Sequence, residues 1–97
     1  MKFKAQVYIT GWGLNREDAN FSLQFAKKEF KDNFGGYTSI AARGSASNYA
    51  EMDVIIVETA ISITDIPKFT RMCRTIKDLS LQESLFTVLP FGIVRWV

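Results

Sequence analysis

Apolar and polar residues alternate along residues 3–10. The apolar positions are Phe3, Ala5, Val7 and Ile9, and the positions between them are Lys4, Gln6, Tyr8 and Thr10. A period of two predicts a strand with one apolar face. The segments "YTSIAAR" (37–43) and "EMDVIIVETAI" (51–61) predict a second and a third strand. Because the aliphatic middle of the third strand is continuous, we expect it to be buried on both faces at the centre of a sheet.

Two segments have the apolar spacing of helices. The first begins at a cap at Asn15 or Asp18 and ends near Phe34, where Gly35-Gly36 is a stop signal. Its predicted core stripe is Ala19, Leu23, Ala26, Phe30 and Phe34. The second begins at Thr64 or Asp65, with Pro67 in its first turn. Its predicted core stripe is Ile66, Phe69, Met72, Cys73, Ile76 and Leu79.

The end of the chain predicts a last strand over residues 84–97 that is interrupted between Pro90 and Gly92. The resulting order is that of a ferredoxin-like α+β domain: βαββαβ, an antiparallel sheet with two helices on one face, here with an extra C-terminal strand segment. Right-handed crossovers place the first and third strands in the centre. We expect the 97 residues to form a single domain, 1–97.

The chain has no histidine and only one cysteine, Cys73. This composition removes the commonest general base and the commonest metal ligand, and no zinc-binding spacing can be written. No P-loop or GxGxxG phosphate-binding loop is present, and the acidic residues form no magnesium-binding motif. We therefore assign no catalytic residue, no metal site and no cofactor, and we expect a protein that is not an enzyme.

Charge and hydropathy limit the partners. The net charge is +2, which is too weak to indicate nucleic acid. "VYITG" at Val7 resembles the first-strand motif of RNA-recognition domains, but the third strand is aliphatic where those domains have base-stacking aromatic residues. The sequence shows no signal peptide and no run of 18 apolar residues, and a single cysteine is compatible with a reducing compartment. We expect a cytoplasmic protein that binds neither membrane nor nucleic acid.

Aromatic residues make up 13% of the chain, so we expect some of them to contact a partner. The sheet face that carries Tyr8 is left open by the helices, and a second copy in a homodimer or higher oligomer is its simplest cover. The alternative cover is the C-terminal segment, which contains Trp96. Phe21 and Phe25 lie one turn apart on the polar side of the first helix. They form a second candidate interface, unless residues 44–50 or the C-terminal strand cover them.

A second group of candidates is charged. Lys68, Arg71 and Arg74 lie on the outer face of the second helix, which is the usual place for solvated charges. The alternative is a small anionic ligand, such as a nucleotide, at a subunit junction. The candidate ligand-binding residues are Tyr37, Arg43, Arg71 and Arg74. The enzyme alternative is a small histidine-free protein of the dimeric α+β barrel type acting on an aromatic molecule, with a pocket lined by Tyr8, Trp12, Tyr37, Arg43 and Glu58.

Four short motifs, "FGGYT" (34–38), "RGS" (43–45), "VIIVETA" (54–60) and "QES" (82–84), resemble a small family of uncharacterised bacterial and phage ferredoxin-like domains. The resemblance covers about residues 7–88 and implies a fold but no activity. We expect Gln82, Glu83 and Ser84 to satisfy backbone groups in a helix-to-strand turn, with Glu83 as a catalytic acid the alternative. The expected function is a non-enzymatic homo-oligomeric binding module, a phage or mobile-element protein that blocks a host protein or sequesters a small anionic ligand.

Overall fold

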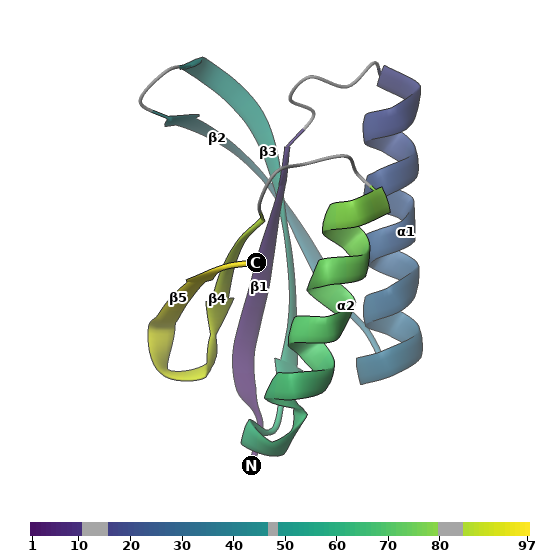
Figure 1. Ribbon diagram of the computed structural model, residues 1–97, viewed down its shortest axis with the longest axis vertical. Coiled ribbons are helices and arrows are strands. Elements are labelled where there is room, and N and C mark those ends of the chain that lie inside the picture. The colour runs from purple at the N-terminus through teal and green to yellow at the C-terminus, as the bar shows by residue number, and fades with distance from the viewer. Residues whose placement is uncertain (11–15, 47–48, 80–84) are drawn as a thin grey trace.

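The computed structural model describes residues 1–10, 16–46, 49–79 and 85–97, which form an antiparallel sheet and two long helices (Figure 1). The elements follow one another as β1 (Phe3–Thr10), α1 (Arg16–Phe34), β2 (Thr38–Ala46), β3 (Tyr49–Ile61), the short 3-10 helix η1 (Ile63–Asp65), α2 (Ile66–Leu79), β4 (Phe86–Leu89), the short helical turn η2 (Pro90–Gly92) and β5 (Ile93–Trp96). Both long helices lie on one side of the sheet (Figure 1).

The strands lie in the order β2-β3-β1-β4-β5, and neighbouring strands are antiparallel. β1 pairs with β3 along its whole length, from Phe3 opposite Ile61 to Thr10 opposite Val54. The α+β class is confirmed, and the first and third strands are interior as predicted. The exact ferredoxin-like βαββαβ arrangement is not matched, because the order of strands includes a fifth one at the edge.

The predicted interruption between Pro90 and Gly92 and the extra C-terminal strand segment are confirmed, but the two parts do not continue as one strand. Residues 86–96 form two antiparallel strands, because the chain reverses at Phe91 and Gly92, whose φ angles are 67° and 73°. β5 therefore extends the sheet beside β4 and does not fold over its open face. The β2–β3 hairpin also differs, since β2 continues to Ala46 and β3 begins at Tyr49, within the segment predicted as a turn.

The hydrophobic core lies between the helices and one face of the sheet. Its buried side chains are Ala5, Val7 and Ile9 of β1, Val57 and Ile61 of β3, Ala26 and Phe30 of α1, Phe69, Met72, Cys73 and Ile76 of α2, and Leu85 and Leu89 near β4. Phe30 and Phe69 join the two helices edge to face, with ring centroids 5.8 Å apart. Because alternate residues of a strand point to opposite faces, the even-numbered side chains of β1 point away from the helices.

Two side chains on the helices differ from the predicted stripes. Leu79, the last residue of α2, is 46% exposed because the helix ends there. Phe25 was expected to be exposed with Phe21, but it is half-buried and packs against the core. The reason is that the buried stripe of α1 includes Ser22 and Ala26, so Phe25 lies at its border. The side chain of Ala19 lies outside the described residues.

The cap of the helical segment that leads into α2 is Ser62, two residues before the first of the predicted caps, Thr64 and Asp65. Asp65 is not the cap but stabilises it: its Oδ2 accepts hydrogen bonds from the Ser62 backbone N–H at 3.2 Å and from the Ser62 hydroxyl at 2.8 Å. These hydrogen bonds hold the pKa of Asp65 below its ordinary value.

We expect this interaction to make the stability of the fold depend on pH. The pKa of Asp65 is lower in the folded chain than in the unfolded chain, so the ionised carboxylate stabilises the fold above about pH 4. That stabilisation is lost as the pH falls through the folded pKa. Thermal unfolding of the wild type and of Asp65→Asn between pH 7 and pH 3 checks this, and the wild type should lose more stability. An equal loss in both proteins would exclude this role of Asp65.

Candidate functional site

An apolar row crosses the face of the sheet that the helices leave uncovered. In the sheet register, Ile40 of β2 lies opposite Ile56 of β3, which lies opposite Tyr8 of β1. Phe86 of β4 lies opposite Trp96 of β5. The ring centroids of Tyr8 and Phe86 are 4.9 Å apart, and those of Phe86 and Trp96 are 5.1 Å apart. We refer to these five side chains, one from each strand, as the sheet-face row.

The sheet-face row is most accessible at its two ends. Ile40 is 39% exposed and Trp96 is 65% exposed, whereas the three side chains between them are half-buried. Both ring pairs pack edge to face, with interplanar angles of 75°. Rings in this arrangement do not present parallel faces for stacking with bases. The row therefore suits the apolar side chains of a protein partner better than single-stranded nucleic acid.

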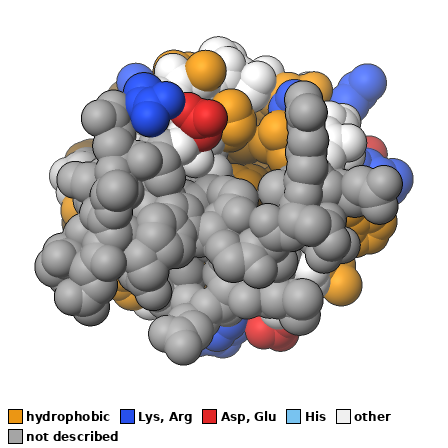
Figure 2. Space-filling view, turned by 90° about the horizontal axis from the view of Figure 1, so that it is seen from above, with side chains coloured by type: hydrophobic (Ala, Val, Ile, Leu, Met, Phe, Trp, Pro, Cys, Tyr) orange, Lys and Arg blue, Asp and Glu red, His pale blue; other side chains and the backbone are white. Residues whose placement is uncertain are grey.

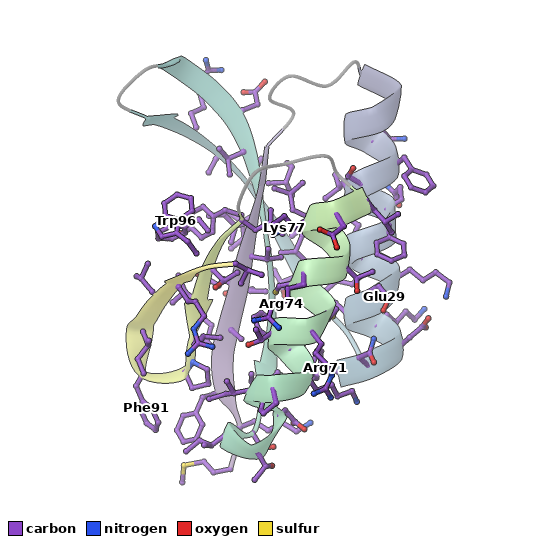
Figure 3. The ribbon with its side chains drawn as sticks, in the orientation of Figure 1. Glu29, Arg71, Arg74, Lys77, Phe91 and Trp96 are labelled. Atoms are coloured by element: carbon purple, nitrogen blue, oxygen red, sulfur yellow. The ribbon has the colours of Figure 1, made fainter. Side chains whose placement is uncertain are left out.

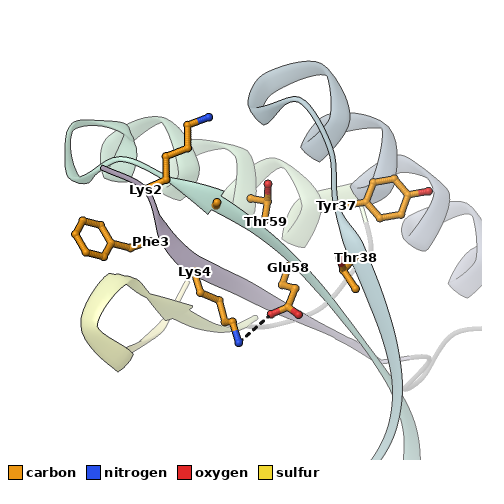
Figure 4. Close-up of a pocket in the computed structure, with 8 residues that line it drawn as sticks. Lys2, Phe3, Lys4, Tyr37, Thr38, Glu58 and Thr59 are labelled. Atoms are coloured by element: carbon orange, nitrogen blue, oxygen red, sulfur yellow. Dashed lines mark ion pairs between the residues drawn. The ribbon is translucent and has the colours of Figure 1, made fainter.

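A polar cluster around Glu58 lies beside the sheet-face row. Gln6 Nε2 donates a hydrogen bond to Glu58 Oε2 at 3.1 Å, and Lys4 Nζ lies 3.7 Å from the same oxygen (Figure 4). The lysine side chain is 69% exposed, and that of Glu58 is 17% exposed. Because the Lys4 cation already has an acidic partner, this part of the face offers little net charge to an anionic ligand.

A shallow depression of about 400 Å³ lies where the beginnings of β1 and β2 meet the end of β3 (Figure 4). It is lined by Lys2, Phe3, Lys4, Tyr37, Thr38, Glu58, Thr59 and Ala60. Of the residues expected to line an enzyme pocket, the depression contains Tyr37 and Glu58. Tyr8 lies in the sheet-face row, Arg43 lies further along β2, and Trp12 is outside the described residues. The described members of that set therefore do not converge on this depression.

The four residues expected to bind an anionic ligand lie on three separate parts of the chain. Arg43 on β2 pairs with Asp53 on β3 at 2.9 Å. Arg71 and Arg74 project from α2, in the helical layer (Figure 3). Tyr37 precedes β2, and Lys27 Nζ lies 5.9 Å from the centre of its ring. A ligand site at a subunit junction stays a prediction.

The space-filling view down the long axis also shows charges of both signs at one end of the molecule. Among the described atoms, Figure 2 shows a basic and an acidic group side by side next to hydrophobic surface. The described surface at this end therefore carries both signs of charge, rather than the single sign that attracts a polyanion.

The structure brings together two of the four residues expected at a protein interface. Tyr8 and Trp96 both belong to the sheet-face row, where Phe86 lies between them. Phe21 and Phe25 lie on α1, in the other layer of the molecule, where Phe21 is 59% exposed. Phe86 was missed by sequence reasoning. In the structure Phe86 lies between the buried residues Leu85 and Thr87, which places it on the open face of a strand. Because Thr87 is polar, the sequence shows no alternation that would have revealed this.

Among the described residues, the remaining candidate for chemistry is Cys73, and it gives no reactive site. Burial raises the pKa of Cys73 to about 12, so its thiol stays protonated and a poor nucleophile at neutral pH. Gln82, Glu83 and Ser84 lie outside the described residues. Within the described ranges, no three acidic or cysteine side chains gather where they could hold a metal ion. The described helices also include none that is long and apolar enough to cross a membrane.

No protein-family model matches the chain, and neither a curated protein nor a solved structure matches it significantly. The resemblance to bacterial and phage ferredoxin-like domains therefore stays a prediction. The sheet-face row is the feature on which a function can be based.

Proposed function

We propose that the protein is a non-enzymatic, homo-oligomeric binding module, and that the sheet-face row is its contact with a second copy. The observation that supports this proposal is the row itself: five apolar side chains, one from each strand, lie together on a face that neither described long helix covers. We also propose that β1 to β4 and the two helices form a ferredoxin-like unit, which β5 extends at one edge.

The open face is large enough to contribute most of a dimer interface. Strands lie about 4.8 Å apart and rise about 3.3 Å per residue, so five strands of about six residues cover roughly 500 Å² before side-chain relief is added. A standard interface buries about 800 Å² per partner, and crystal contacts bury less than about 400 Å² per partner. The face therefore exceeds the range of chance contacts and approaches that of a specific interface.

The row also fits a copy of itself. Consider a two-fold axis that runs parallel to β1, midway between the two stacked sheets. It places Trp96 of one copy over Ile40 of the other, so that the largest side chain of the row meets a smaller aliphatic one. Tyr8, on the central strand, lies near the axis. The contact is then isologous, with the same patch used by both copies. Apolar surface covers apolar surface, and the neighbouring Glu58 carboxylate is already paired with Lys4.

The mass of the protein in solution at micromolar concentration, measured by light scattering, tests this proposal. We expect a dimer or a larger assembly for the wild type. Trp96→Ser should raise the dissociation constant about 10- to 100-fold, because a partly buried aromatic side chain is lost twice in a two-fold interface. Phe21→Ser is the matched control, since Phe21 is also exposed but lies on α1, and it should leave the mass unchanged.

Three results would count against the proposal. A monomeric wild type across the micromolar range would exclude self-association. Trp96→Ser with the mass of the wild type would exclude the sheet-face row as the interface. A loss of assembly in Phe21→Ser as large as that in Trp96→Ser would move the interface to the helical layer.

A further inference from the structure

β5 is an edge strand that is exposed on both of its faces. Ile93 and Val94 are each 53% exposed, Trp96 is 65% exposed, and Arg95 is exposed as well. Proteins usually protect such edges with proline, charged side chains, bulges or a covering element, because unpaired backbone groups bind other strands. β2, at the opposite edge, has a register irregularity between Gly44 and Ala46. β5 has only Arg95, and no described element lies along its free edge.

The hydrogen bonds of the β4–β5 pair show which backbone groups are free. Leu85 and Val97 exchange two backbone hydrogen bonds, of 3.1 and 3.0 Å. Opposite residues in an antiparallel pair alternate between those that exchange such bonds and those that do not. In this register, Val94 and Trp96 occupy the positions that do not bond to β4. Their N–H and C=O groups therefore point toward the free edge.

We propose that this free edge binds the same edge of a second copy, so that two β5 strands pair antiparallel around a two-fold axis at Val94. This contact goes beyond the sheet-face interface and does not depend on it: it joins copies side by side into one continuous sheet. Val94 then lies opposite its counterpart, and Trp96 lies opposite Gly92 of the second copy. Gly92 has no side chain, so it leaves room for the indole ring.

Arg95 favours a second copy in this register. It is exposed, and it forms no ion pair with a described side chain. A two-fold axis at Arg95 would place two like charges directly opposite each other, which is unfavourable. An axis at Val94 places Arg95 opposite Ile93 of the second copy instead. The aliphatic part of the arginine can then cover exposed Ile93 while its guanidinium stays in water.

Val94→Pro tests the edge contact without disturbing the β4–β5 pair. Proline removes the N–H of Val94, which points away from β4, and edge strands tolerate proline in such positions. The preceding residue, Ile93, already has φ −70° and ψ 120°, the conformation that proline requires of it. Val94→Thr is the matched control because it keeps the N–H and the branched shape.

Light scattering over a range of concentrations compares the three proteins. We expect the wild type and Val94→Thr to assemble beyond a dimer, and Val94→Pro to stop at the dimer, with edge association weakened at least tenfold. Assembly of Val94→Pro equal to that of Val94→Thr would overturn the edge contact. If Ile40→Lys, in the sheet-face row and far from β5, lowered the mass while Val94→Pro did not, the edge contact would fail and the proposed function would stand. A wild type that stays monomeric would exclude both.

Cross-linking tests the register. Residues that exchange hydrogen bonds across antiparallel strands have Cα atoms about 5.5 Å apart, within the range that a disulfide spans. We expect Val94→Cys to form a covalent dimer under mild oxidation and Arg95→Cys to form much less of it. Cys73 does not compete, because it is buried. A covalent dimer of Arg95→Cys that forms as fast as that of Val94→Cys would overturn the axis at Val94.

Discussion

Phe69→Ala should lower the free energy of unfolding by about 3–5 kcal/mol, because it removes a buried aromatic ring and leaves a cavity. Phe69 is fully buried, and its ring centroid lies 5.8 Å from that of Phe30 and 6.0 Å from that of Phe34. It therefore holds α2 against α1 as well as against the core. The loss is a substantial part of the 5–15 kcal/mol that stabilises an ordinary domain, so the variant should unfold at a much lower urea concentration than the wild type.

Urea unfolding followed by circular dichroism measures this loss. Phe21→Ala is the matched control, since it removes the same ring from a site that is 59% exposed, and it should change the free energy by less than about 1 kcal/mol. Losses of similar size in the two variants would mean that the aromatic cluster between the helices does not stabilise the fold as the structure indicates.

Ile40→Lys should weaken self-association about 1000-fold. Ile40 ends the sheet-face row at the β2 edge and is 39% exposed, so the monomer should accept a lysine there. In the proposed dimer the substitution brings two lysines into the interface, where each loses water without gaining an acidic partner. Unpaired charges in an interface cost several kcal/mol together, and every 1.4 kcal/mol changes the dissociation constant tenfold.

The neighbouring residue provides the control. Ser39 is exposed on the same edge strand, but it lies opposite Val57, on the other face of the sheet. Ser39→Lys adds the same charge one position away and should leave the dissociation constant within about threefold of the wild-type value. Sedimentation equilibrium of both variants measures the effect. Equal weakening in both would show that net charge, rather than the sheet-face row, controls assembly.

The fold was predictable where local chemistry decides it. The alternation in residues 3–10 predicted β1, and Gly35 marked the end of α1, where it has φ 85°. The C-terminal hairpin was not predictable in the same way. Its reversal requires Phe91 to adopt φ 67°, a left-handed conformation that bulky side chains rarely take. A phenylalanine gives no sign of that conformation, so residues 84–97 read as one interrupted strand.

The candidate site was predictable only in pieces. The alternation placed Tyr8 on the open face, and the apolar C-terminal segment predicted an interface role for Trp96. Nothing in either segment showed that the two side chains would lie in the same row. Their proximity depends on the pairing of β1 with β4 and of β4 with β5. Such register is set by contacts between distant parts of the chain, whereas periodicity within a segment reports only which face a side chain occupies.

The central place of β1 has a consequence for how the protein is made. The ribosome delivers β1 before the other described strands, yet one of its two neighbours is β4, about 80 residues later in the sequence. Until residues 86–89 emerge, β1 can pair only with β3. Pairing over such a distance in sequence is slow, and an unpaired strand in a nascent chain readily binds other chains. The yield of protein in cells should therefore depend on chaperones that shield this strand during synthesis.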